Sequence, residues 1–313
     1  MHLKNALRLT FTHNSLVIKS LVYRLFIYAF YFVCTYLLLD NIFSVFFTEE
    51  CFSELFSNLW KYTRGFFKGE GFSSGMLDKH FTDCVKVIVN TCKANIGRII
   101  CFVLFNIVFE IVNNFADSAI VNVVNNHMSY MSREGFFGSL VRNFKMAISY
   151  GVFFAVFKTL YVFISLLLII LICVGSFKII GFFALPFAII IYILSVALRQ
   201  TLISQILPSM AVNKHNLFKA IKQIKFNGEF SGLFVNYILA YSLTLYVNIT
   251  AILCSFGAGA ILTVPLTYML IDILGLTSYF EINKMKYYIT YDLRYIPKEL
   301  RDNDEHLLNQ MNI

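Results

Sequence analysis

The chain has 313 residues, of which 58% are hydrophobic and only 14% are charged, and its formal net charge is +8. Soluble domains carry roughly 25% charged residues, so this composition excludes a soluble enzyme, a secreted disulfide scaffold and a disordered regulator. The apolar residues fall in long runs whose ends are basic. This pattern predicts an all-α polytopic membrane protein whose positive charge contacts lipid headgroups rather than nucleic acid.

Six apolar runs are long enough to cross a bilayer, which takes about 20 residues in a helix. They predict transmembrane helices at about 16–47, 96–124, 146–174, 179–207, 233–255 and 258–281. Turns at 175–178 and 256–259 would join the third span to the fourth and the fifth to the sixth. The spans would form one membrane domain, residues 1–283, with an insertion at 48–95 and a tail at 284–313.

The distribution of Lys and Arg predicts the orientation of the spans, because cations are enriched in cytoplasmic loops. They cluster before the first span and within its start, where Lys19 and Arg24 lie, between spans two and three, between spans four and five, and after span six. We therefore expect a multi-pass cell-membrane protein with both termini and the tail in the cytoplasm and residues 48–95 outside. Outside, Cys51 could form a disulfide with Cys84 or with Cys92, and the sequence leaves both alternatives open.

Three short segments, at 3–8, 136–141 and 217–222, precede the odd-numbered spans and align with one another. Each has a small residue, Ala6, Ser139 or Ala220, followed by an aliphatic one. They predict three hairpin repeats, each preceded by a basic amphipathic surface helix; the alternative is that any Lys-rich amphipathic helices would align this well. The cations expected at anionic headgroups are Lys4, Arg8, Arg142, Lys145, Lys219, Lys222 and Lys225.

The last 180 residues carry Met210-Ala211-Val212 ahead of Ile221-Lys222, and Thr263-Val264-Pro265 in the returning span. This order resembles the membrane domain attached to some bacterial glycerophosphodiester phosphodiesterases, and related uncharacterised six-helix bacterial integral membrane families. The resemblance implies a helical membrane fold. It does not imply the hydrolase activity, since that requires a soluble barrel domain for which this chain has no room.

The sequence contains none of the motifs that would indicate an enzyme or a metalloprotein. No Cys-x-x-Cys pair occurs and no His lies in the middle of a span, so we expect no metal site and no haem. Phosphate-binding glycine loops, zinc-protease motifs and nucleophile-elbow motifs are also missing. We therefore expect a protein without a cofactor and without enzymatic activity.

The second span is unusually polar on one helical face, because its polar residues follow spacings of four, three and four. Ionisable groups in hydrocarbon are costly and usually face a bundle interior or a wet cavity. The residues predicted to face such an interior are Asn106, Glu110, Asn113, Asp117, Lys158, Arg199, Tyr241, Asn248 and Asp272. Their depths, at 1.5 Å per residue, predict ion pairs of Glu110 with Lys158 and of Asp117 with Arg199. Such pairs either fix the bundle geometry alone or belong to a binding cavity.

Three hypotheses for the function follow. The first is a non-enzymatic, transporter-like protein that handles a substrate or a lipid through its polar interior. The second is a scaffold or accessory subunit of a larger membrane complex. The third is the permease subunit of an exporter driven by a separate ATPase. The lipid bilayer and its anionic headgroups are expected partners in all three.

Overall fold

The computed structural model describes residues 2–67, 75–180, 184–224, 228–290 and 293–296. Two compact units make up the chain: Met1–Ile27 with Glu110–Ile313, and Tyr28–Phe109. The predicted surface cation Lys225, the side chain of Cys51 and the end of the tail lie outside the described residues. The two alternative pairings of Cys51 therefore stay a prediction.

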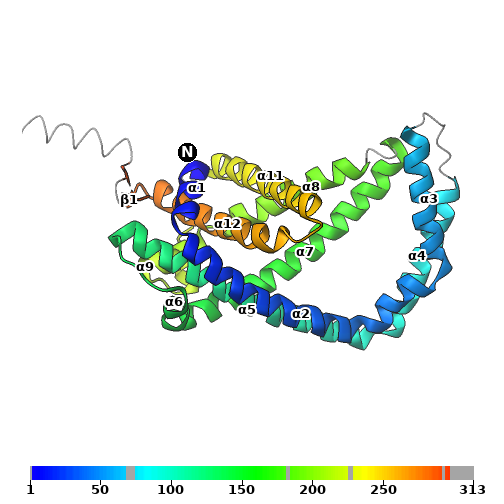
Figure 1. Cartoon of the computed structure of the whole chain (residues 1–313), viewed down its shortest axis with the longest axis horizontal. Helices are drawn as coiled ribbons and strands as arrows, with labels where there is room; N and C mark the ends of the chain where they lie inside the picture. The colour runs from blue at the N-terminus through cyan, green and yellow to red at the C-terminus, as the bar shows by residue number, and fades with distance from the viewer. Residues whose placement is uncertain (1, 68–74, 181–183, 225–227, 291–292, 297–313) are drawn as a thin grey trace, which may run out of the picture. The chain divides into compact units, whose positions relative to one another are not determined.

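Helices dominate both units (Figure 1). The first unit contains α1 (His2–Thr12), the start of α2 (Asn14–Thr48), the part of α5 (Ile96–Tyr130) from Glu110 onward, α6 (Phe136–Arg142), α7 (Phe144–Ile180), α8 (Ala184–Ile203), α9 (Ile206–Asn213), α10 (Leu217–Lys222), α11 (Phe230–Ser255) and α12 (Ala260–Ile282). The second contains the remainder of α2 and α5 with α3 (Glu50–Phe67) and α4 (Gly75–Ala94).

Within the described residues, six helical segments are long and apolar enough to cross a membrane, as a helical multi-pass membrane protein requires. They are Asn14–Val45, Ile96–Tyr130, Phe144–Ile172, Phe187–Asn213, Phe230–Ser255 and Ala260–Ile282. Large apolar side chains such as Phe26, Leu171 and Leu253 point outward on these helices. A helix suits this environment because it satisfies the backbone hydrogen bonds within the segment, where hydrocarbon offers no partner.

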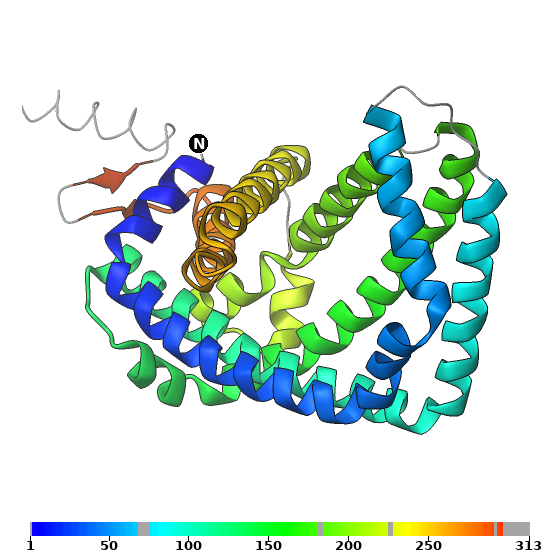
Figure 2. The ribbon, with the colours of Figure 1, turned by 45° about the vertical axis from the view of Figure 1, so that its right-hand side comes forward.

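In the first unit α7 packs on α8, α8 on α11, and α11 on α12. Figure 2 shows α1 (dark blue) beside the end of α12 (orange), and α1 is in close contact with that helix. The buried core is richest in α1, in the second half of α5, in α9 and in the second half of α12. It is built largely from Ala, Ile, Leu and Met, whose compact or flexible side chains allow helices to approach closely.

The course of the third and fourth spans differs from the prediction. α7 continues as a helix through 175–178, where we predicted a turn, and α8 begins only at Ala184. The returning span is then interrupted between α8 and α9, where Ser204 and Gln205 are buried. A glycine inside a helix costs only about 1 kcal/mol relative to alanine, which is less than breaking the backbone ladder in lipid, so Gly175 does not end α7.

The start of the tail packs against the helices. Two short strands, β1 (Tyr287–Tyr288) and β2 (Arg294–Tyr295), pair antiparallel with Tyr287 opposite Tyr295. Tyr287 is buried, and its hydroxyl accepts a hydrogen bond from Asn5 Nδ2 (2.8 Å) and donates one to Glu281 Oε1 (2.7 Å). Burial, reinforced by the carboxylate of Glu281, raises the pKa of Tyr287 well above its usual value. These bonds join α1, α12 and β1.

In the second unit α3 and α4 pack side by side (Figure 1). Aromatic contacts join its portions of α2 and α5: Tyr31 lies 5.6 Å from Phe105 and 4.0 Å from Phe109, measured between ring centroids. The hydroxyl of Tyr31 donates a hydrogen bond to Asn106 Oδ1 at 3.2 Å. Asn106, which we predicted to face the polar interior with its neighbours on α5, thus has its partner in this unit.

Candidate binding cavity

Helices α5, α7, α8, α11 and α12 of the first unit surround a cavity of about 480 Å³. Eight of the nine residues predicted to face a polar interior line it; Asn106 is the exception. The eight are Glu110, Asn113, Asp117, Lys158, Arg199, Tyr241, Asn248 and Asp272. Residues from five helices that are far apart in the sequence thus meet around one space.

The helical spacing of α5 explains why this helix contributes most of the amides and carboxylates. Glu110, Asn113, Asn114 and Asp117 are three or four residues apart, so their side chains lie on one face of the helix. Asn114 also donates a hydrogen bond to the Glu110 carbonyl at 2.6 Å, which holds its side chain along the helix. The predicted polar face of the second span is therefore the face that α5 turns to the cavity.

The predicted ion pair between Glu110 and Lys158 is present. Lys158 Nζ lies 2.6 Å from Glu110 Oε1, and the two side chains are 24% and 15% exposed. The ammonium also lies 5.9 Å from the ring centroid of Phe154, a distance at which a cation is attracted to an aromatic face. The pair joins α5 to α7 at the wall of the cavity.

The second predicted pair is wrong in its cation, because Asp117 pairs with Arg24 and not with Arg199. Arg24 hydrogen-bonds Asp117 and also lies 3.8 Å from Asp272 Oδ2. Its guanidinium carbon is 5.0 Å from the ring centroid of Tyr268. We had placed Arg24 among the cytoplasmic cations, yet its side chain is only 1% exposed. Two buried carboxylates that converge from α5 and α12 need a compensating charge, and Arg24 of α2 supplies it.

Sequence reasoning missed Arg24 because other cations precede it in the chain. A signal was present, since Ser20, Arg24 and Tyr31 recur at near-helical spacing and form a polar stripe on an otherwise apolar span. Ser20 is buried like Arg24, and the intervening Tyr23 donates a hydrogen bond to the carbonyl of Val112 on α5. Arg24 and Tyr23 thus contact α5 in the first unit, and Tyr31 contacts it in the second.

Several polar atoms around the cavity are buried without a hydrogen-bond partner among the described residues. They are Glu110 Oε2, Asn113 Oδ1, Arg199 Nε, Thr244 Oγ1 and Asn248 Oδ1. A buried polar atom without a partner costs free energy, so such atoms are usually satisfied by water or by a ligand. They give the cavity both hydrogen-bond donors and acceptors for a bound molecule.

The charges around the cavity balance. The carboxylates of Glu110, Asp117 and Asp272 face the cations of Lys158 and Arg199, with Arg24 behind two of the carboxylates. The lining also has an apolar and aromatic part, which includes Phe154, Val162, Tyr192, Ile193, Val196, Leu245, Val264, Tyr268 and Ile271. The arrangement is suited to holding a molecule that has polar and apolar parts.

The predicted headgroup-contacting cations lie elsewhere, on the short helices or next to them. Lys4, Arg8, Arg142, Lys145, Lys219 and Lys222 are all exposed. In the described part of the chain, no group of three or more His, Cys, Asp and Glu side chains is placed to hold a metal ion. Comparison with protein-family models, with curated proteins and with solved structures finds no match to this chain.

Proposed function

We propose that this protein binds a small amphiphilic molecule in the cavity between α5, α7, α8, α11 and α12 and handles it without changing it chemically. The observation that carries the proposal is the set of buried polar atoms of five residues around one cavity, which have no hydrogen-bond partner among the described residues. Ion pairs that served only to clamp the helices would leave no such group of unsatisfied atoms. Membrane transporters commonly place their binding sites among helices in this way.

The charge balance of the cavity indicates the kind of molecule. Three carboxylates and three cations sum to a formal charge of zero. The charge of an ion of either sign would therefore stay uncompensated in the cavity. A zwitterion or a neutral polar headgroup can instead bind both signs at once. The aromatic and aliphatic lining would hold the apolar part of the same molecule.

The proposal includes three hairpin repeats, each preceded by a surface helix that contacts anionic headgroups. The short helices α1, α6 and α10 precede α2, α7 and α11, which supports this division. The aligned small residues Ala6, Ser139 and Ala220 are each 0% exposed, as equivalent packing positions should be. The exposed cations described above lie on the same helices or next to them, where they can reach the headgroups.

The test of the cavity fills it and examines what remains bound. We would purify the native chain, Thr244→Trp and Leu239→Trp in lipid nanodiscs and identify retained small molecules by native mass spectrometry. Thr244 lines the cavity, whereas Leu239 is exposed on the same helix and serves as the matched control. We expect a molecule that the native chain and the control retain and that Thr244→Trp loses. Identical retention by all three proteins would contradict the proposal.

The proposed topology places both termini in the cytoplasm at the cell membrane. Cysteines introduced at Ser73 and at Asn303 would be labelled with a membrane-impermeant maleimide in intact cells. We expect labelling above the background of the native cysteines at position 73 and none above it at position 303. The opposite pattern would reverse the orientation.

A further inference from the structure

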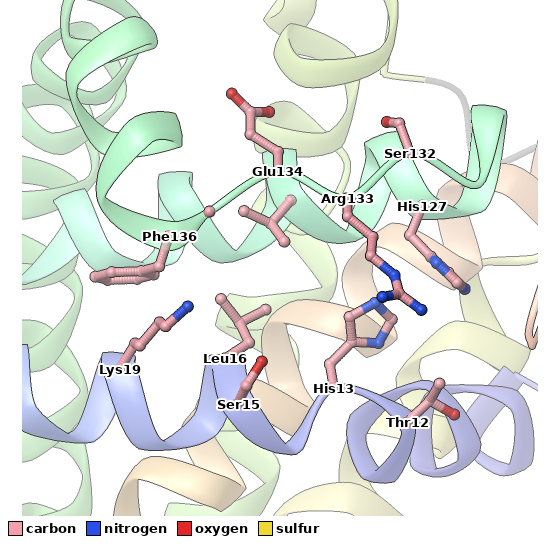
Figure 3. Close-up of a pocket in the computed structure, with 12 residues that line it drawn as sticks. Thr12, His13, Ser15, Leu16, Lys19, His127, Ser132, Arg133, Glu134 and Phe136 are labelled. Carbon is pink, nitrogen blue, oxygen red and sulfur yellow. The ribbon is translucent and has the colours of Figure 1, made fainter.

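A second cavity, of about 430 Å³, lies in the first unit where the start of α2, the end of α5 and the segment before α6 meet. It is separate from the cavity proposed above, with which it shares no lining residue. Figure 3 shows that side chains from two opposing stretches of chain line it. Lys19 and His13 come from one side, and Arg133 and His127 from the other.

The fixed charges that face this cavity are positive. Lys19 and Arg133 both line it. The one carboxylate in the lining, Glu134, points away from Lys19 and Arg133 in Figure 3. It is engaged elsewhere, because it accepts a hydrogen bond from Asn126 and lies 3.8 Å from Arg142 Nη1. Two cations therefore line the cavity, and the carboxylate of Glu134 is directed away from them.

Neutral polar groups also line the cavity. The hydroxyl of Ser15 is one of them, whereas the hydroxyls of Thr12 and Ser132 donate hydrogen bonds to the carbonyls of Arg8 and Asn126. The rings of His13 and His127 meet edge to face, with their centroids 4.7 Å apart. His13 Nδ1 lies 2.8 Å from the Leu9 carbonyl, which can only accept, so this nitrogen carries the proton.

The remainder of the lining is apolar and includes Leu16, Val123 and Phe136. All three belong to the buried core, so they form a fixed wall beside the polar groups. A small free anion gains no favourable free energy from contact with apolar side chains. The glycerol and acyl parts of a lipid would contact it favourably.

The geometry points to a binding site for a phosphate group in this second cavity. A phosphate offers three or four acceptor oxygens. These are enough to be shared between Lys19 and Arg133 on opposite sides of the cavity and the hydroxyl of Ser15. The phosphate can belong to an inner-leaflet lipid headgroup or can be free in the cytoplasm. The apolar wall favours the lipid. This inference is independent of the function proposed for the first cavity.

The experiment compares a lipid that carries a phosphate with the same lipid without it, and with free phosphate. Purified protein in detergent is titrated with phosphatidic acid, with diacylglycerol of the same acyl chains, and with inorganic phosphate, and binding is measured by native mass spectrometry and thermal unfolding. The variants are Lys19→Gln, the double variant Lys19→Gln/Arg133→Gln, and the charge-conserving Lys19→Arg. Lys93→Gln, which changes an exposed lysine of α4 in the second unit, is the matched control.

For a lipid source, we expect phosphatidic acid to bind the native chain more tightly than diacylglycerol does. Lys19→Gln should weaken its binding about tenfold and the double variant about a hundredfold, at roughly one decade for each lost charge-assisted contact. Lys19→Arg and Lys93→Gln should bind like the native chain. Stabilisation by inorganic phosphate that is lost in the same two variants would assign the site to free phosphate.

Equal binding of phosphatidic acid and diacylglycerol by the native chain, the double variant and Lys93→Gln would overturn the inference. It would also be overturned if the native chain neither bound phosphatidic acid nor was stabilised by inorganic phosphate. Elution of each variant as the native species on size exclusion separates loss of the site from loss of the fold. If Lys19→Gln does not elute as the native species, Arg133→Gln alone takes its place. Arg133 is exposed in the segment between α5 and α6.

Discussion

Replacing Lys158 with Met should strand the carboxylate of Glu110 in the wall of the first cavity. In the native chain its Oε1 lies 2.6 Å from Lys158 Nζ, while its Oε2 has no partner among the described residues. Removing one member of a buried ion pair costs about 3–5 kcal/mol, because the other charge stays behind without compensation. Since 24% of the Lys158 side chain is exposed, we expect a loss near the lower end, about 3 kcal/mol.

The assay is a double-mutant cycle in detergent, with unfolding followed by heating or by denaturing detergent. At about 2 °C per kcal/mol for a chain of this size, Lys158→Met should lower the unfolding temperature by about 6 °C. Adding Glu110→Gln removes the stranded charge and should recover part of the loss, with a coupling free energy of about 2 kcal/mol. Lys145→Met changes an exposed lysine on the same helix and should cost less than about 0.5 kcal/mol.

A coupling below about 0.5 kcal/mol would refute this reasoning, because the two residues would then contribute independently. A loss for Lys145→Met as large as that for Lys158→Met would refute it too. Such a result would assign the destabilisation to the removal of any lysine from α7.

Arg24→Met should be more damaging than Lys158→Met, because it leaves two buried carboxylates without their shared cation, and the yield of detergent-stable protein should fall accordingly. Burial lowers the pKa of His13, which lies beside His127, so the unfolded chain binds the proton more readily. Stability should therefore fall as the pH drops below about 6.5, and His13→Gln should reduce that dependence in thermal unfolding. Tyr287→Phe removes two hydrogen bonds, one to the carboxylate of Glu281, and should cost about 2 kcal/mol, visible as faster hydrogen exchange in α1.

The sequence predicted the polar residues of the first cavity because their signal is local. A carboxylate and two amides at helical spacing in an apolar span are costly unless they face an interior, whatever the rest of the fold. The same argument, with depth along the span, predicted that Glu110 and Lys158 would meet. Sequence reasoning failed where the pairing depends on which helices are neighbours. Arg24 and Arg199 both lie at a suitable depth for Asp117, and the packing of the helices places Arg24 beside it.

The second cavity could not be predicted at all. Its lining comes from residues 12–19 and 123–136, which are brought together only when α2 packs against α5. Lys19 and Arg133 look like ordinary cytoplasmic cations in the sequence, because the positive-inside pattern accounts for both. The continuation of α7 past Gly175 escaped prediction for another reason, since a glycine ends a helix readily in water but not in hydrocarbon.

The bonds of Asn5 to Glu281 and Tyr287 have a consequence for biosynthesis. A chain is made from its amino end, so α1 leaves the ribosome long before α12 and β1, the partners of its buried face, exist. During that interval the apolar face of α1, including Ala6 and Leu9, needs another cover, and the headgroup layer of the membrane is the nearest one. A premature stop before residue 281 would leave α1 without its native partners, and quality-control proteases could recognise that exposed face.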